Sequence, residues 1–134
     1  MARGFHMGGA GGAVDDSKNI LIDGVLNPKY TLSGGYTQEN GYVTCWRSGG
    51  TYGCEVNMID LTDMDYIGCD IQNNDASKPI VAYISGGTVY YSAGNTNRQT
   101  LILDVRSYTG VHRLQFQINY AGSGSAKIYN IKAQ

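Results

Sequence analysis

The tetrapeptide Ser-Gly-Gly-Thr occurs twice in the chain, at residues 48–51 and again at residues 85–88. Each copy lies between two short runs of β-branched and aromatic residues, a composition typical of β-strands. A two-residue turn between antiparallel strands needs a positive φ angle, which glycine adopts without steric penalty. A phosphate-binding loop would instead lead into a helix, and no helical pattern follows either copy. The repeat therefore predicts two β-hairpins with Gly49-Gly50 and Gly86-Gly87 at their tips.

These turns also predict which residues of the paired strands face one another. With Gly49-Gly50 as a two-residue loop, Cys45 faces Cys54 on the neighbouring strand. The close Cβ atoms of such a pair permit a strained disulfide, and the alternative is a pair of small buried thiols. In the second hairpin the same rule predicts that Tyr83 faces Tyr90.

The rest of the chain shows strand patterns and no amphipathic helical segment longer than two turns. The composition agrees with this, because 19 glycines and 11 tyrosines accompany turn residues that recur about every ten positions. We therefore expect an all-β fold, a two-sheet antiparallel β-sandwich. Alternation along three of its strands predicts a set of core-facing side chains: Ile67, Cys69, Ile71, Leu101, Leu103, Val105, Leu114, Phe116 and Ile118.

Residues 59–71 and 103–118 share one pattern of construction. Each begins with an aspartate between two apolar residues and continues with two polar residues. A large apolar or aromatic residue, which we call the anchor, follows, and the segment ends in an alternating strand. The anchor is Met64 in the first segment and Tyr108 in the second. The pattern predicts that the chain passes from one sheet to the other at both places.

The first 18 residues hold five glycines within their first twelve positions and little that could enter a core. They are either a flexible tail, partly a leader of cloning origin, or an arm that orders only against a partner. In the second case Phe5 and Met7 serve as its apolar anchors. We therefore divide the chain into a glycine-rich arm, 1–18, and a sandwich domain, 19–134.

The charge and the apolar pattern argue against several classes of protein. A net charge of −1, with single lysines and arginines scattered along the chain, lacks the basic stripe of a nucleic-acid-binding protein. No apolar run approaches the length of a membrane span, and the glycine-rich start does not match a secretion signal. Three cysteines, an odd number, favour a reducing compartment over a disulfide framework.

No motif for catalysis is present, so we do not expect an enzyme or a cofactor. The two histidines, His6 and His112, lie outside any nucleophile or metal motif, and His112 is expected to be a surface strand residue. Four aspartates cluster in the sequence, at Asp60, Asp63, Asp65 and Asp70. Their spacing does not match a calcium loop, so we interpret them as solvated turn carboxylates and expect no metal site.

Three segments carry a resemblance to a known family: "IDLTDMDYIGCDI", "LILDVRSYTGVHRLQFQI" and the terminal "SAKIYNIKAQ". Over residues 19–134 the chain resembles galactose-binding-like jelly-roll modules, in particular the small ones carried by structural proteins of tailed bacteriophages. The resemblance implies a non-catalytic virion structural or decoration protein, assembled in the host cytoplasm and anchored by its arm. Its partners would be other virion proteins and further copies of itself, as a homo-oligomer such as a trimer. The alternative is a carbohydrate-binding module that attaches to a host glycan.

A sugar-binding surface would need aromatic rings that stack on sugar faces and polar side chains that hydrogen-bond hydroxyl groups. Such residue types gather at the first hairpin tip and in and after the second. The same tyrosines are also ordinary strand residues, so core and cross-strand packing is the competing interpretation. The candidate ligand or partner residues are Trp46, Arg47, Tyr52, Tyr90, Tyr91, Asn95, Asn97 and Arg98.

Overall fold

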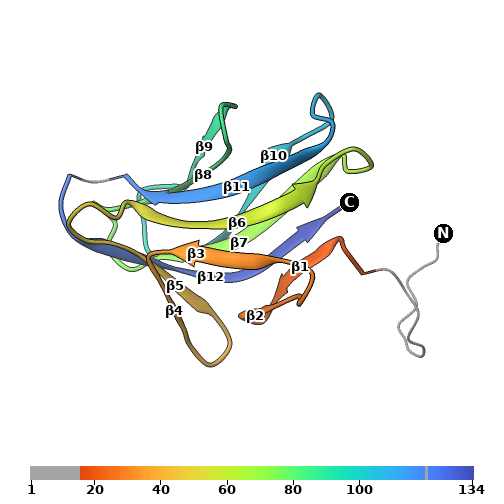
Figure 1. Ribbon diagram of the computed structural model, residues 1–134. Helices are drawn as coiled ribbons and strands as arrows, with labels where there is room; N and C mark the ends of the chain where they lie inside the picture. The colour runs from red at the N-terminus through yellow and green to blue at the C-terminus, as the bar shows by residue number, and fades with distance from the viewer. Residues whose placement is uncertain (1–15, 120) are drawn as a thin grey trace.

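The computed structural model describes residues 16–119 and 121–134, which form two antiparallel sheets packed face to face (Figure 1). The expected all-β sandwich is confirmed. Among the described residues no helix is long and apolar enough to cross a membrane. Phe5, Met7 and most of the proposed arm lie outside the described part of the chain.

Twelve strands follow one another along the described chain. They are β1 (Asn19–Ile22), β2 (Val25–Leu26), β3 (Thr31–Gly34), β4 (Tyr36–Gln38), β5 (Val43–Arg47), β6 (Gly53–Asp60), β7 (Tyr66–Asn73), β8 (Ile80–Ile84), β9 (Val89–Tyr91), β10 (Arg98–Asp104), β11 (Val111–Ile118) and β12 (Gly124–Ala133). Strands β2, β3 and β4 are short and have no clear alternation, and the sequence patterns did not predict them.

The two sheets differ in size and in how their strands are ordered. One sheet has five strands in the order β3-β6-β11-β8-β9. The other has seven, and its long strand β12 pairs with β7 along one edge and with both β5 and β1 along the other. Strand β10 extends this sheet beyond β7, while β4 and β2 extend it beyond β5 and β1.

The core lies between the sheets, and all nine side chains predicted to face it are buried. Leu114, Phe116 and Ile118 contribute from β11 and meet Ile67, Cys69 and Ile71 from β7 in one continuous cluster. Burial of such side chains provides the main favourable free energy of folding, about 1.5–3 kcal/mol for each large one.

Both connections predicted to cross between the sheets do so. Strand β6 of the five-stranded sheet leads to β7 of the seven-stranded sheet, and β10 leads back to β11. The two links touch, because the Leu61 amide donates to the Gly110 carbonyl at 2.9 Å and the Gly110 amide donates to the Thr62 hydroxyl. The anchors also pack on the core: Met64 is buried and Tyr108 is half-buried.

The first predicted hairpin is confirmed only at its tip. Ser48 and Thr51 exchange backbone hydrogen bonds around Gly49-Gly50, and Gly49 has a φ of 59°. Beyond the turn the strands part, since β5 joins the seven-stranded sheet and β6 the five-stranded one. The predicted pairing of Cys45 with Cys54 on adjacent strands is therefore wrong.

The strands part because Gly35 is inserted between them. The Trp46 amide donates to the Gly35 carbonyl at 2.9 Å, and the Gly35 amide donates to the Gly53 carbonyl at 2.7 Å. The continued hairpin would instead have paired Trp46 with Gly53 directly. Only glycine fits here, because a Cβ on Gly35 would lie 2.4 Å from the Trp46 carbonyl oxygen.

The two cysteines nevertheless meet, from opposite sheets. Cys45 pairs along the backbone with Tyr36 and Ala126, whereas Cys54 pairs with Gly34 and Phe116. Both thiols are free and point into the core, where a hydrogen bond with Cys45 raises the pKa of Cys54. Of the two alternatives at this pair, the small buried thiols are the ones observed.

The second hairpin is present, but its register differs by one residue from the prediction. Its loop has three residues rather than two, closed by a hydrogen bond of 2.7 Å from the Gly87 amide to the Ile84 carbonyl. Tyr83 consequently pairs with Val89, and Tyr90 pairs with Ala82. A shift of one residue reverses the face of every side chain on a strand. Tyr90 therefore points toward the interior.

Candidate functional site

The outer face of the five-stranded sheet carries a group of tyrosine and amide side chains brought together by strand register. One row across the sheet runs from Gly53 through Gln117 and Val81 to Tyr91. The next row places Gln115 beside Tyr83 and Glu55. Together with Tyr52, these side chains form what we call the tyrosine–glutamine face: Tyr52, Glu55, Tyr83, Tyr91, Gln115 and Gln117.

A hollow of about 200 Å³ lies in this face above Gly53. Its walls include Tyr52, Tyr83, Gln115 and Gln117, which surround the one position in the row without a side chain. Glycine is required there, because a Cβ on Gly53 would lie 2.0 Å from the Phe116 carbonyl oxygen. The close approach of the β6 and β11 backbones at Gly53 thus accompanies a depression on the surface.

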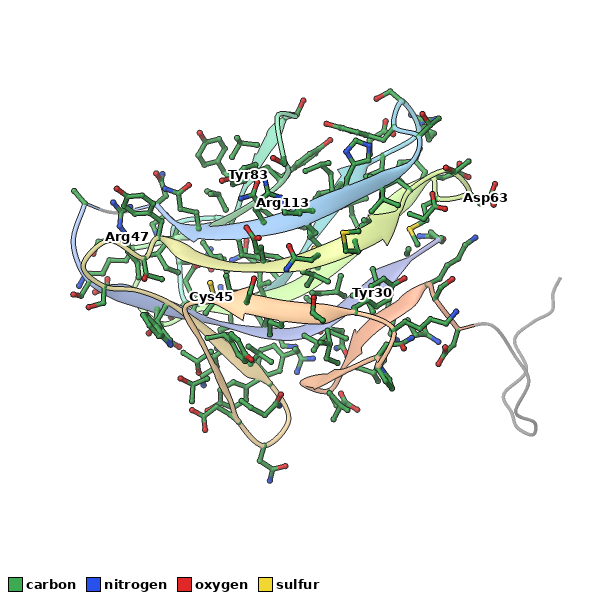
Figure 2. The ribbon with its side chains drawn as sticks, viewed as in Figure 1. Tyr30, Cys45, Arg47, Asp63, Tyr83 and Arg113 are labelled. Carbon is green, nitrogen blue, oxygen red and sulfur yellow. The ribbon has the colours of Figure 1, made fainter. Side chains whose placement is uncertain are left out.

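Polar groups at this site are partly paired and partly open. The carboxylate of Glu55 accepts hydrogen bonds from Gln115 at 3.2 Å and from Arg113 at 3.5 Å. Tyr83 and Arg113 extend from neighbouring strands of the same sheet (Figure 2). The amide of Gln117 makes no side-chain hydrogen bond to any other residue that the structure describes. The face therefore offers the donor and acceptor atoms of the Gln117 amide to a ligand. Beside them the charges of Glu55 and Arg113 offset each other.

Tyr52 is the most accessible ring beside the hollow, with 54% of its surface exposed. The guanidinium of Arg47 covers one face of this ring, and its Nη1 atom donates to the Ile118 carbonyl at 3.0 Å. Such a contact holds an exposed ring in one orientation. At the far edge of the sheet, Tyr91 is 64% exposed.

The structure gathers three of the predicted candidates, Arg47, Tyr52 and Tyr91, at the outer face of the five-stranded sheet. Arg47 itself ends β5 of the seven-stranded sheet and reaches this face through its contact with the Tyr52 ring. Sequence reasoning missed Glu55 and Tyr83 as site residues. Gln115 and Gln117 were not among the predicted site residues either. The available signal was their alternation with the core residues of β11, but only the pairing with β6 and β8 shows that they line a hollow.

The other predicted residues lie elsewhere. Trp46 is half-buried on β5, in the seven-stranded sheet, and Arg98 pairs with Asp70 on that same sheet. The Tyr90 hydroxyl accepts a hydrogen bond from the Asp104 amide, so this ring has a packing role between the sheets. Asn95 and Asn97 lie in the exposed loop before β10, where Asn95 accepts from the Asn97 amide.

Of the clustered aspartates, Asp70 lies within β7 and pairs with Arg98, so its interpretation as a solvated turn carboxylate is wrong. Asp60 accepts from the Thr62 amide in a turn, as expected for a turn carboxylate, and this bond lowers its pKa. A ring nitrogen of His112 lies 2.8 Å from the Thr109 carbonyl oxygen. Within residues 16–119 and 121–134, no group of three or more His, Cys, Asp or Glu side chains is placed to hold a metal ion.

Comparison with known proteins identifies a solved structure with a similar fold. No family model matches the sequence, and no curated protein matches it. A solved structure of a carbohydrate-binding module does match: a point mutant of CBM29-2, studied for ligand recognition by family 29 carbohydrate binding modules. The likeness covers 87% of this chain and 89% of that one, with a TM-score of 0.64 and 18% sequence identity. The chain thus has the jelly-roll β-sandwich fold of such a module.

Proposed function

We propose that the protein is a non-catalytic carbohydrate-binding module whose ligand lies on the tyrosine–glutamine face. The observation that carries this proposal is the hollow over Gly53, bordered by the exposed ring of Tyr52 and by the open amide of Gln117. Sugars present apolar C–H faces that stack on aromatic rings and hydroxyl groups that pair with amides. The similarity of the fold to a carbohydrate-binding module supports the same function.

The face suits a short, neutral saccharide chain better than a single sugar. From Gly53 to Tyr91 the row crosses three strand spacings, about 14 Å at the usual separation of neighbouring strands. Tyr52 would stack at one end and Tyr91 at the other, with the glutamine between them bonded to hydroxyl groups. Glu55 and Arg113 neutralise each other, and the guanidinium of Arg47 is held against the Tyr52 ring and the Ile118 carbonyl.

A role as a virion protein stays a prediction from the sequence resemblance. The matching structure described above is a carbohydrate-binding module, and the residues proposed to anchor the chain, Phe5 and Met7, lie outside the described structure. Homo-oligomer formation and attachment to a host glycan likewise remain predictions. The carbohydrate-binding function has the better support and is the one we propose.

A panel of neutral oligosaccharides, followed by titration calorimetry on the best ligand, tests the proposal. Tyr52→Ala and Gln117→Ala should each weaken binding at least severalfold while the folded domain persists. Tyr36→Ala is the matched control, since Tyr36 is an exposed tyrosine (38%) on β4 of the other sheet. Absence of binding to every saccharide, or equal loss in Tyr52→Ala and Tyr36→Ala, would refute the site.

A further inference from the structure

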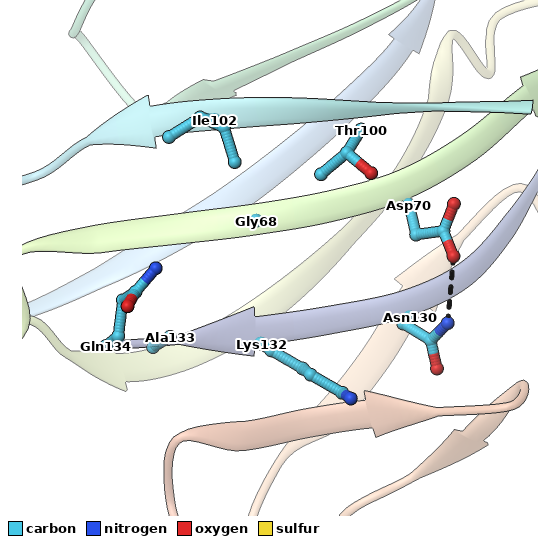
Figure 3. Close-up of a pocket in the computed structure, with 8 residues that line it drawn as sticks. All are labelled: Gly68, Asp70, Thr100, Ile102, Asn130, Lys132, Ala133 and Gln134. Atoms are coloured by element: carbon cyan, nitrogen blue, oxygen red, sulfur yellow. Dashed lines mark hydrogen bonds between the residues drawn. The ribbon is translucent and has the colours of Figure 1, made fainter.

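A second pocket lies on the opposite side of the sandwich, on the outer face of the seven-stranded sheet (Figure 3). Its volume is about 460 Å³, and it opens above Gly68 in the middle of β7. Gly68 pairs with Ile102 on one side and Lys132 on the other. Because position 68 has no side chain, the space between Ile102 and Lys132 stays open.

The neighbouring row supplies hydrogen-bonding groups to the same pocket. Asp70 pairs along the backbone with Thr100 on β10 and with Asn130 on β12. Arg98 holds the Asp70 carboxylate through two nitrogens, at 3.1 and 2.6 Å, and Asn130 donates to it at 3.0 Å. These bonds lower the pKa of Asp70, so its oxygens are ionised acceptors in a fixed orientation.

Lys132 is the cationic side chain in the lining of the pocket. Asp70 is already paired with Arg98, and the ammonium of Lys132 forms no ion pair with any residue in the described part of the chain. Figure 3 shows its side chain extending toward Asn130, along the polar side of the pocket. On the other side Ile102 is 52% exposed and offers an apolar wall.

This combination matches the chemistry of an acidic sugar. A hexuronate has one carboxylate, several hydroxyl groups and an apolar C–H face. We propose that this pocket, the Gly68 pocket, binds a hexuronate residue. Lys132 pairs with its carboxylate, Asp70, Asn130 and Thr100 hydrogen-bond its hydroxyl groups, and Ile102 contacts its C–H face. The site lies on the opposite sheet from the tyrosine–glutamine face and does not depend on it.

Titration of the labelled protein with galacturonate and glucuronate, followed by amide NMR shifts, tests the proposal directly. Saturable shifts are expected at Gly68, Thr100 and Lys132, and they should weaken with added salt because the contact includes a charge pair. Galactose and glucose should bind about tenfold more weakly, as they lack one charge-assisted hydrogen bond. Acetate, a plain carboxylate, should also bind weakly. Equal responses to uronates and to either control would overturn the assignment.

Two matched variants distinguish specific uronate binding in the Gly68 pocket from general attraction of a uronate to a positive charge. Lys132→Gln should lose about tenfold in uronate affinity. Lys127→Gln makes the same charge change on the same strand, but Lys127 lies over the Tyr42 ring, 4.9 Å from its centroid, and should keep full affinity. Equal loss in both variants would contradict the proposal. Tyr52→Ala should leave uronate binding unchanged, which distinguishes failure of this site from failure of the neutral-saccharide site.

Discussion

The guanidinium carbon of Arg47 lies 4.4 Å from the centroid of the Tyr52 ring. Arg47 is the last residue of β5, in one sheet, and Tyr52 directly precedes β6, in the other. The contact therefore spans the point where the first hairpin divides. A ring held in place before the ligand arrives loses little conformational freedom on binding, which favours affinity.

Arg47→Ala should weaken saccharide binding severalfold, because the Tyr52 ring is no longer held in its stacking orientation. Its effect on stability should be about 1–2 kcal/mol, because both the cation–π contact and the hydrogen bond to the Ile118 carbonyl are lost. Calorimetric titration with the best neutral oligosaccharide measures the first effect. Arg106→Ala is the control, since Arg106 makes a similar contact with Tyr66 at 5.0 Å. Equal binding by Arg47→Ala and the wild type would show that the contact does not prepare the site.

Gly53→Ala should strongly destabilise the fold, by about 2–4 kcal/mol, because its Cβ would overlap the Phe116 carbonyl oxygen. Gly50→Ala provides the contrast, as no atom lies within 4 Å of a Cβ built there. It should change the free energy of unfolding by about 0.5 kcal/mol or less. Urea denaturation followed by fluorescence compares the two. Similar costs at both positions would contradict the close approach at Gly53.

Phe116→Ala should cost about 3–5 kcal/mol, the usual result of truncating a buried aromatic side chain. Phe116 is buried between the sheets, whereas Tyr91 is exposed on edge strand β9. Tyr91→Ala should therefore leave the free energy of unfolding almost unchanged while it reduces saccharide binding. Denaturant titration measures the stability of both variants, and a mild effect at Phe116 would show that the core can collapse around the gap.

Stability should fall at acid pH through the paired aspartates. Hydrogen bonds from Arg106 lower the pKa of Asp104 to about 2, and Arg98 lowers that of Asp70. A carboxyl with a lower pKa in the folded state stabilises the fold above its unfolded pKa, near 3.8, and this contribution disappears as pH falls through the folded value. Carboxyl NMR titration should place Asp104 near pH 2, and Arg106→Ala should return it toward 3.8.

The three cysteines should resist thiol reagents in the folded protein. All three are buried, and burial raises the pKa of Cys69, while Cys45 raises that of Cys54. Because only the thiolate reacts, modification should require unfolding. A colorimetric thiol assay with and without denaturant checks this, and rapid reaction of the native protein would contradict the observed packing.

Local patterns in the sequence predicted which residues of a strand face the core but not always which strands are neighbours. Alternation identified Leu114 and Phe116 correctly, because burial of one face imposes a period of two. The pairing of Cys45 with Cys54 failed because Gly35, distant in sequence, takes the hydrogen bonds between their strands. The Tyr90 prediction failed since a three-residue loop and a two-residue loop look alike in a Ser-Gly-Gly-Thr sequence.

The candidate site was predictable only in part for the same reason. Tyr52 was found because it lies close to a glycine turn, which brings it to the surface. Tyr83 and Gln115 lie more than thirty residues apart in the chain and become neighbours only when β8 pairs with β11. No local pattern carries that information.

Strand β12 follows all the other described strands in the chain, yet it lies in the interior of the seven-stranded sheet, with β7 on one edge and β5 and β1 on the other. Until β12 is in place, β1 and β5 have no partner that joins them to β7, and their edges stay open to other chains. The seven-stranded sheet therefore closes only through pairing between segments far apart in the chain, which slows folding.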